Sequence, residues 1–276
     1  MEITVGLFLL LFGLAFFCEY IDASLGMGYG TILTPVLLIV GFTPQLVVPA
    51  VLLSQAFGGL TASLLHHELK NVSFRPGSRD FKLVVIVSGF GILATILAAS
   101  VAINLPKNVV KTYIGVLVLV MGLIVLRNRS YTFSWTKMIL VGVISAFNKG
   151  ISGGGFGPVV TGGQVLSGQD HKAAVGVTTL SEAPICICGF FTYLIGRTVQ
   201  EVGGDVLAMP FTSFLSEMFS ARMFQWELFL ALILGSVLVA PFGAFTTRLL
   251  KPRGLHLILG SLITVLGVWT LAKTWL

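Results

Sequence analysis

The sequence predicts an all-α integral membrane protein with two inverted repeats, each a glycine-broken helical hairpin followed by three transmembrane helices. Three observations predict this fold class. Hydrophobic residues make up 55% of the 276 residues and charged residues only 10%, whereas soluble domains carry about 25% charged residues. Apolar stretches long enough to cross a bilayer recur along the chain, and one pattern of glycines occurs twice. We expect residues 1–130 to form the first repeat and residues 131–276 the second, within a single membrane domain.

The first element, residues 3–41, does not fit a single span. An apolar run to Ile21 is followed by the polar and glycine-rich segment 22–30, and a short apolar run then reaches Gly41. Irregular backbone at membrane depth is tolerated only where it is buried in protein or lines a wet cavity. We therefore expect two short helices around a buried break. A transmembrane helix needs about 20 apolar residues, and three stretches of that length follow, over 44–65, 82–103 and 108–127.

The second half repeats this order of elements. Residues 137–168 contain a short apolar run to Phe147, the glycine-rich segment 148–157 and a second short run to Gly168. Three full spans are expected to follow, over 172–195, 226–247 and 254–275. We conclude that each half is a broken element followed by three spans.

A constant offset relates the two halves residue by residue. An offset of 127 pairs Gly26, Gly28, Tyr29, Gly30, Thr34, Ser54 and Gln55 with Gly153, Gly155, Phe156, Gly157, Thr161, Ser181 and Glu182. Further along the chain the offset is 145, which pairs Gly115 and Gly122 with Gly260 and Gly267. The difference between the offsets indicates an insertion in the longer loop around 196–225.

The charges of the loops predict how the broken elements lie in the membrane. If each returns to its starting side, one face receives 11 basic residues and the other 5, with Lys149 left out as intramembrane. If each crosses once, the division is 10 against 6. Because Lys and Arg gather on the cytoplasmic side, the first arrangement is favoured. It makes the two halves inverted, since three spans is an odd number, and it places both termini outside.

The two glycine breaks are the candidate substrate site. Glycine adopts backbone conformations closed to other residues and lets a ligand approach the main chain. A helix that starts just after such a break points free N–H groups and a partial positive charge into it, which suits an anion. Discontinuous helices at corresponding places in two halves point to the binding site of a transporter. The alternative is that the glycines only let helices pack closely.

Polar residues beside the breaks complete the candidate site. Lys149 would attract or neutralise an anion, or else pair with Asp22, its counterpart in the repeat. Hydroxyl and amide groups would donate hydrogen bonds to an oxyanion, or else bond helix to helix. The substrate-binding candidates are Gly28, Tyr29, Gly30, Thr34, Ser54, Gln55, Asn148, Lys149, Ser152, Gly153, Gly154, Gly155, Phe156, Gly157, Thr161 and Ser181. The acids Glu19, Asp22 and Glu182 are candidates for proton coupling, because ionisable residues within spans are costly and by default functional.

Two segments of the second half, and a weaker copy in the first, are typical of a known family. The first segment is Ser152-Gly153-Gly154-Gly155-Phe156-Gly157-Pro158 with Gly168, and the second is Lys172-Ala173-Ala174-Val175-Gly176-Val177-Thr178-Thr179. The weaker copy is Gly26-Met27-Gly28-Tyr29-Gly30 with Pro35, Gly41 and Pro44. On these motifs the sequence resembles the TauE/SafE family of sulfite-exporter-like membrane transporters. The resemblance implies transport, usually export, of sulfite or related sulfur-containing anions, including organosulfonates.

We therefore expect a secondary transporter of a small sulfur-containing anion, in the form of a multi-pass protein of the prokaryotic plasma membrane. A passive anion channel is the main alternative, and saturable flux with counterflow would separate the two. An intramembrane protease would need paired aspartates or a Ser/His pair at membrane depth, which the sequence does not offer. A receptor or structural protein would show no substrate-dependent flux.

The expected partners are a small anionic substrate and the lipid bilayer, with a homodimer left open. No cofactor, metal or nucleic-acid partner is expected, because the basic residues form no stripe and no metal-ligand pattern occurs. His66 and His67 are expected to face the loop at the end of their span. The three cysteines are expected only to pack.

Overall fold

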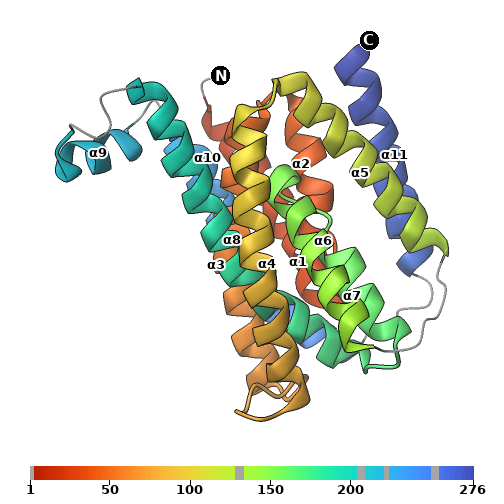
Figure 1. The fold of residues 1–276 in the computed structure, drawn as a ribbon. Coiled ribbons are helices and arrows are strands. Elements are labelled where there is room, and N and C mark those ends of the chain that lie inside the picture. Colours follow the sequence, from red (N-terminus) through yellow and green to blue (C-terminus); the bar gives the residue numbers. More distant parts are fainter. Residues whose placement is uncertain (1–2, 128–133, 204–208, 221–223, 250–254) are drawn as a thin grey trace.

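The computed structural model describes residues 3–127, 134–203, 209–220, 224–249 and 255–276, and in these ranges the secondary structure is entirely helical (Figure 1). The helices in chain order are α1 (Val5–Leu25), α2 (Tyr29–Val40), α3 (Pro44–Glu68), α4 (Arg79–Asn104), α5 (Lys107–Arg127), α6 (Trp135–Ser152), α7 (Phe156–Leu166), α8 (His171–Val202), α9 (Phe211–Met218), α10 (Trp226–Thr246) and α11 (Leu255–Trp275). The predicted all-helical class is confirmed.

Seven of the described helices are long and apolar enough to cross a membrane: α1, α3, α4, α5, α8, α10 and residues Leu257–Trp275 of α11. The six predicted full spans are among them. The first broken element differs from the expectation of two short helices, because α1 has 21 residues and qualifies as a span by itself, while α2 has only 12. The run from Val5 onward is apolar for long enough that the helix continues through Asp22 before it ends.

Both breaks form where the sequence places them, and for the same local reason. Gly26 ends α1 with φ +72° and Gly153 ends α6 with φ +72°. Gly28 and Gly155 precede the next helices with φ +138° and +83°. Side chains other than glycine rarely adopt these conformations, so these four glycines end one helix and allow the next to start in a new direction.

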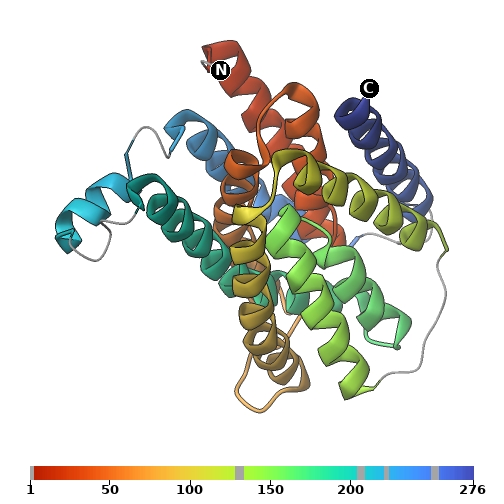
Figure 2. The same ribbon diagram turned by 45° about the horizontal axis from the view of Figure 1, so that its top comes forward.

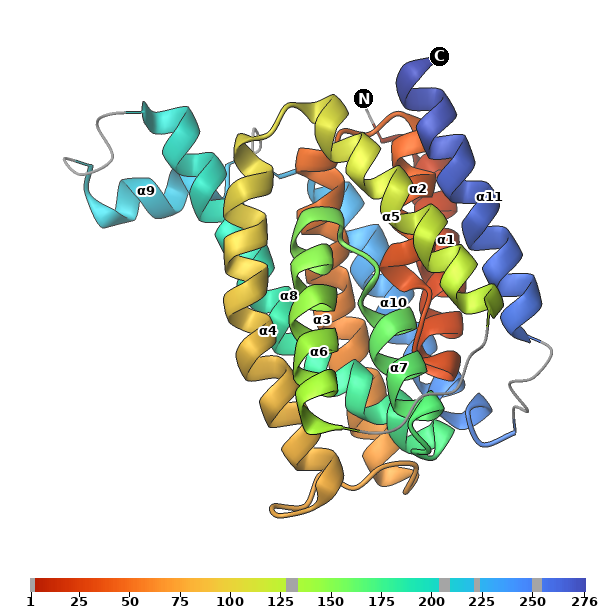
Figure 3. The same ribbon diagram turned by 45° about the vertical axis from the view of Figure 1, so that its right-hand side comes forward.

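The two hairpins point in opposite directions (Figures 1 and 3). Helix α1 begins and α2 ends at the upper end of the bundle in Figure 1, whereas α6 begins and α7 ends toward the lower end. Helix α11 ends at the same end as α1 begins. The short helix α9 extends sideways beyond the end of α8 (Figure 2).

Four close helix pairs build the bundle: α1 with α10, α4 with α6, α3 with α8, and α5 with α11. Helix α3 also packs along α10, and α8 along α4. Small residues let helices approach closely where no hydrophobic force distinguishes protein from lipid. Gly91 and Gly150 of the α4–α6–α8 group illustrate this, since a Cβ at either would press into a neighbouring helix.

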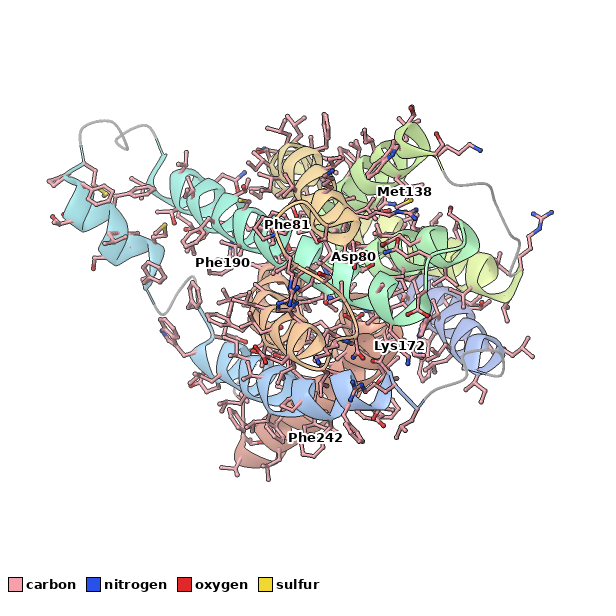
Figure 4. All side chains as sticks on the ribbon, turned by 90° about the horizontal axis from the view of Figure 1, so that it is seen from below. Asp80, Phe81, Met138, Lys172, Phe190 and Phe242 are labelled. Atoms are coloured by element: carbon pink, nitrogen blue, oxygen red, sulfur yellow. The ribbon has the colours of Figure 1, made fainter. Side chains whose placement is uncertain are left out.

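Large apolar side chains cover much of the outside of the bundle. Phe242 on α10 is 63% exposed and lies toward the edge of the bundle seen from below (Figure 4). In the same view Asp80 and Lys172 mark the starts of α4 and α8. Such an apolar exterior with polar helix ends suits a protein surrounded by lipid. The polar groups that matter for function are therefore found inside the bundle.

Candidate functional site

The two glycine breaks touch each other through their backbones. A Cβ on Gly30 would strike the carbonyl of Gly153, and a Cβ on Gly157 would strike the carbonyl of Gly26. A Cβ on Gly154 would lie 2.7 Å from the carbonyl oxygen of Gly30. We call this contact between the two breaks the crossing, and these three glycines are needed for it because no side chain would fit. Close packing, one of the two roles expected from the sequence, therefore holds for them.

Hydroxyl groups bond across the crossing. The N–H of Gly155 donates to Oγ1 of Thr31 at 3.1 Å, and Oγ1 of Thr161 donates to the carbonyl of Gly26 at 2.7 Å. Within the second break itself, Oγ of Ser152 accepts from the N–H of Gly154 at 3.0 Å. The helix starts are thus held together from both sides, and Thr161 and Ser152 are used by the protein itself.

Thr34, the repeat counterpart of Thr161, is different. It is fully buried, and its hydroxyl has no hydrogen-bond partner among the described residues. The hydroxyl oxygen lies 3.0 Å from the position that a Cβ on Gly153 would take, so it faces the second break. A buried hydroxyl without a partner costs free energy, and a ligand at the break is one way to satisfy it.

A chain of four buried polar side chains runs through the middle of the bundle. Nζ of Lys149 lies 2.7 Å from Oε1 of Glu182 and donates to the amide oxygen of Gln55. The amide nitrogen of Gln55 donates to Oδ2 of Asp22 at 3.3 Å. Lys149 therefore pairs with Glu182 and reaches Asp22 through Gln55, so the Lys149–Asp22 pairing considered from the sequence is not direct. The chain links α1, α3, α6 and α8.

Asp22 also binds the start of α2. Its Oδ1 accepts from the N–H of Tyr29 at 3.2 Å, so a carboxylate of the protein lies at the end of the helix that carries partial positive charge. The hydroxyl of Tyr29 donates to Oγ of Ser54 at 2.6 Å. At the second break the residue seven positions before the helix start is Lys149, so an ammonium takes the place in the sequence that a carboxylate has at the first.

Carboxyl groups outnumber ammonium groups in this core. Glu19 is fully buried, both of its carboxyl oxygens lack partners among the described residues, and a Cβ on Gly58 would lie 3.0 Å from Oε1. Together with Asp22 and Glu182 it makes three buried carboxyl groups around one buried Lys149. Burying an unpaired charge is strongly unfavourable, and this core holds more acids than the one described cation can pair with.

The remaining predicted residues lie close by but are used structurally. Oδ1 of Asn148 accepts from the hydroxyl of Tyr113. Ser181 donates to the carbonyl of Val177 and accepts at its own carbonyl from Ser88. Phe156 is fully buried and has no hydroxyl to match that of Tyr29. These side chains therefore hold helices in place around the crossing.

Sequence reasoning missed several of the bonding partners. Thr31 directly follows Gly30, so its place in the first turn of α2 is a signal that could have identified it. Ser88 and Ser236 are serines within apolar spans, which commonly bond across helices, and Oγ of Ser236 donates to the carbonyl of Ser54 at 3.0 Å. Nothing in the sequence pairs Tyr113 with Asn148.

The expectation that His66 faces the loop is wrong. His66 is fully buried, with Nε2 2.9 Å from the carbonyl oxygen of Ala23 and Nδ1 3.0 Å from the amide nitrogen of Asn71. Because the amide nitrogen of Asn71 can only donate, Nδ1 of His66 accepts from it and Nε2 donates to the carbonyl of Ala23. His66 thus anchors the last turn of α1 just before the first break. His67 is partly buried and stacks on Phe74.

A separate surface cavity lies where α3 joins α4. Its volume is about 480 Å³, and its lining includes Glu68, Lys70, Arg75 and Asp80. Acids and bases alternate here, so no excess positive charge favours an anion. Within the described residues there is also no group of three or more His, Cys, Asp and Glu side chains that could hold a metal ion.

Comparison with known proteins agrees with this architecture. The profile of the sulfite exporter TauE/SafE family matches residues 11–270. The chain is also 25% identical, over 272 residues, to a probable membrane transporter protein, YtnM, of Bacillus subtilis (strain 168), a match that covers 94% of this chain and 80% of the relative. No solved structure matches the chain significantly. Because the family match covers nearly the whole chain, the protein belongs to the TauE/SafE sulfite exporter family and is a multi-pass membrane transporter.

Proposed function

We propose that this transporter carries a small sulfur-containing anion, sulfite or an organosulfonate, and that the anion binds beside the crossing of the two glycine breaks. The observation that carries the proposal is the position of Lys149, which is 1% exposed and lies in the helical turn that leads into the second break. A buried cation in a membrane bundle is costly and points to a substrate or ion pathway. Export is the direction that the family description states.

The second break is the better anion site of the two. At the first break the start of α2 already holds the carboxylate of Asp22. At the second, α7 starts after Gly155 with Lys149 in the corresponding place, and the hydroxyl of Thr34 faces Gly153 without a partner among the described residues. An ammonium, a helix start and an unused donor together offer what an oxyanion needs.

We further propose that the two halves are inverted repeats, because contacts that join them are reciprocal. On the long helices α5 and α11, each glycine contact has a counterpart. Adding 145 to the residue on α5 and subtracting 145 from the residue on α11 gives a second contact of the same kind. The contacts that a Cβ would make are Gly115 with Leu271, Gly122 with Thr264, Gly260 with Leu126 and Gly267 with Leu119. A two-fold relation between the halves would produce such reciprocity.

The same reciprocity extends to the breaks. Gly30 meets Gly153 as Gly157 meets Gly26, and the hydroxyls of Thr34 and Thr161 face Gly153 and Gly26 in turn. Helix α1 packs on α10 as α6 packs on α4. Inverted repeats give a transporter two equivalent packings with the site at the middle, so an exchange of the two halves' conformations would expose the site to each side in turn.

A carrier is favoured over the passive anion channel by the direct backbone contact at the crossing. Gly30, Gly154 and Gly157 approach the opposite break so closely that no side chain would fit. An open pore would need this contact to be separated, whereas a carrier needs one side at a time to open. The distinction can be measured as counterflow.

The test is uptake of labelled sulfite by proteoliposomes that contain the purified protein. Liposomes preloaded with unlabelled sulfite should take up label faster than empty ones, and the rate should saturate. Sulfate, thiosulfate and methanesulfonate as competitors would define the class of anion. Uptake that never saturates and gains nothing from preloading would indicate a channel, and the absence of any protein-dependent flux for all four anions would contradict the proposal.

A further inference from the structure

We propose that the protein binds one proton together with each anion, and that the carboxyl group of Glu182 is the proton-binding group. The inference rests on the proposed function and adds to it the coupling of anion transport to proton binding. The structural basis is the ion pair between Lys149 and Glu182, with 2.7 Å between Nζ and Oε1 and with side chains only 1% and 4% exposed. In this state the ammonium that would attract the substrate is held by a carboxylate of the protein.

The charge of Lys149 is already paired with an anion of the protein. Its Nζ is bonded to Glu182 and to the amide oxygen of Gln55, which leaves one of the three donors of an ammonium, but a second anion there would find no second cation among the described residues of the core. A substrate that binds Lys149 strongly must therefore replace the carboxylate of Glu182. The replaced group would be a bare charge in the membrane interior, next to a second anion, and such a charge is strongly unfavourable unless it is neutralised. Binding a proton neutralises it.

Apart from Lys149, the charged groups that face Glu182 are acids. From α1, Asp22 and Glu19 face the same core, and Cys186 lies one turn further along α8. Helix α7 carries no titratable side chain, and those of α3 and α4 lie near the helix ends, at His66–Glu68 and Arg79–Lys82. Lys149 is thus the cation that faces Glu182 among the described residues, and the other charged groups of the core are acids.

The repeat shows which side chain can replace the acid. The counterpart of Glu182 on α3 is Gln55, which bonds both Lys149 and Asp22. A glutamine at this place therefore fits the same kind of buried position without a charge. The carboxyl group of Glu182 has the shape of that amide, and it differs in the charge that pairs with Lys149 and in its ability to bind and release a proton.

The coupled step balances in atoms and charge. A proton from the solution forms an O–H bond with the carboxylate of Glu182, and the pairing of Lys149 passes from that carboxylate to the substrate anion. Release of the anion on the other side returns Lys149 to Glu182, and the proton leaves. For a singly charged sulfonate the pair moves no net charge, so transport should not respond to membrane potential.

The experiment measures the binding of methanesulfonate, because a sulfonate is the anion of a strong acid and keeps its one negative charge throughout the pH range of the measurement, unlike sulfite. Wild-type protein in weakly buffered solution should take up one proton per anion bound. On the alkaline limb its affinity should fall about tenfold per pH unit, as linkage to one proton requires. The variant Glu182→Gln should bind methanesulfonate with no proton uptake and with an affinity that does not change with pH. Glu227→Gln, at an exposed acid in the first turn of α10, should behave as wild type.

Three outcomes separate the inference from the proposal on which it rests. Binding by wild type without proton uptake contradicts the inference and leaves the proposed function standing. Proton uptake that persists in Glu182→Gln moves the coupling to Asp22 or Glu19 and overturns the assignment to Glu182. If neither methanesulfonate nor sulfate nor sulfite binds at any pH, the proposed function itself fails. The wild-type measurement needs no variant, so poor folding of Glu182→Gln would not remove the test.

Discussion

The charged core shows how a membrane protein can keep an ammonium group in its interior. Lys149 lies between a carboxylate and an amide oxygen, each from a different helix. Replacing an ion pair of this kind by neutral groups often costs little, whereas removing one partner leaves a buried charge and costs about 3–5 kcal/mol. A substitution at Lys149 therefore has two effects, one on binding and one on stability, and a test must separate them.

Lys149→Gln should lower the affinity for sulfite by at least about tenfold, because the Coulomb attraction of a buried ammonium is larger than the same attraction in water. It should also lower stability, since Glu182 loses its partner. Isothermal titration and thermal unfolding in detergent measure the two effects.

The control is the double variant Lys149→Gln with Glu182→Gln, which removes the whole ion pair. Its stability should recover toward that of wild type, and its affinity for sulfite should stay low. If the double variant binds sulfite as tightly as wild type does, Lys149 lies outside the site.

Thr34→Val tests the buried hydroxyl that faces the second break. The substitution keeps the shape and removes an oxygen that has no partner among the described residues, so stability should stay the same or rise. The affinity for the anion should fall about tenfold, the typical effect of one hydrogen bond to a charged group.

The matched control is Thr161→Val in the other half. The hydroxyl of Thr161 donates to the carbonyl of Gly26, so this variant should lose stability. Equal losses of stability in both variants would mean that the hydroxyl of Thr34 is satisfied within the protein.

At the residue scale the sequence predicted which polar groups gather, but not how they pair. Lys149, Glu182, Asp22 and Gln55 were all predicted, because charged and amide side chains within spans are costly enough to be conspicuous. The partner of Lys149 depends on how α6 and α8 are rotated relative to each other, which a linear pattern does not contain. His66 shows the same limit, since an end-of-span histidine has the same sequence context whether it faces the loop or the neighbouring helix.

At the scale of elements, the glycine breaks combine a packing role with a conformational role. Gly157 lies against the backbone of Gly26 and Met27, so a methyl group there would strike atoms that cannot rotate away. Gly155 has φ +83° and would place a methyl group 3.1 Å from the flexible side chain of Leu117. The two positions should therefore respond differently to the same substitution.

Gly157→Ala should destabilise the protein by about 3 kcal/mol, the upper part of the range for overpacking. Gly155→Ala should cost about 1–2 kcal/mol, the strain of a left-handed conformation, and should reduce anion binding more than stability if the second break holds the substrate. Gly162→Ala on α7 has open space around its Cβ and serves as the control. Melting curves with and without sulfite compare the three variants.

The outcome that would contradict this prediction is an unchanged stabilisation of the Gly155→Val variant by sulfite. If Gly155→Val unfolds at a lower temperature yet sulfite raises that temperature as much as in wild type, the second break only packs helices and the site lies elsewhere.

The boundaries of the elements were predictable where glycine ends them. Gly26, Gly41 and Gly153 are the residues at which α1, α2 and α6 end, because only glycine adopts the required φ cheaply. The extent of α1 was not predicted. The break was expected to begin at Asp22, but in the structure the helix continues to Leu25, and Asp22 is buried within it.

At the scale of the whole molecule, we propose that the two hairpins enter the membrane from opposite sides. Their directions in the bundle agree with this, since α2 ends at the end of the bundle opposite to that at which α7 ends (Figure 3). The basic loops predicted the same arrangement from charge alone. The domain boundary at residues 130 and 131 falls outside the described residues and stays a prediction.

Cysteine labelling in intact cells tests the topology. In a background with Cys188→Ser, single cysteines at Gly77 and Ser134 should react from one side of the membrane, and single cysteines at Lys107 and Gln200 should react from the other. The first two precede α4 and α6 and the last two lie near α5 and the end of α8. Labelling of Gly77 and Ser134 from opposite sides would contradict the inverted arrangement.

The position of the bound anion decides whether the substrate site lies at the second break. Selenite has the shape and charge of sulfite, and its selenium atom can be located by anomalous scattering in crystals soaked with it. We predict one peak, removed by excess sulfite, within hydrogen-bonding reach of Lys149, the hydroxyl of Thr34 and the start of α7. A peak instead in the cavity between α3 and α4, near Lys70 and Arg75, with none at the crossing of the breaks, would contradict it.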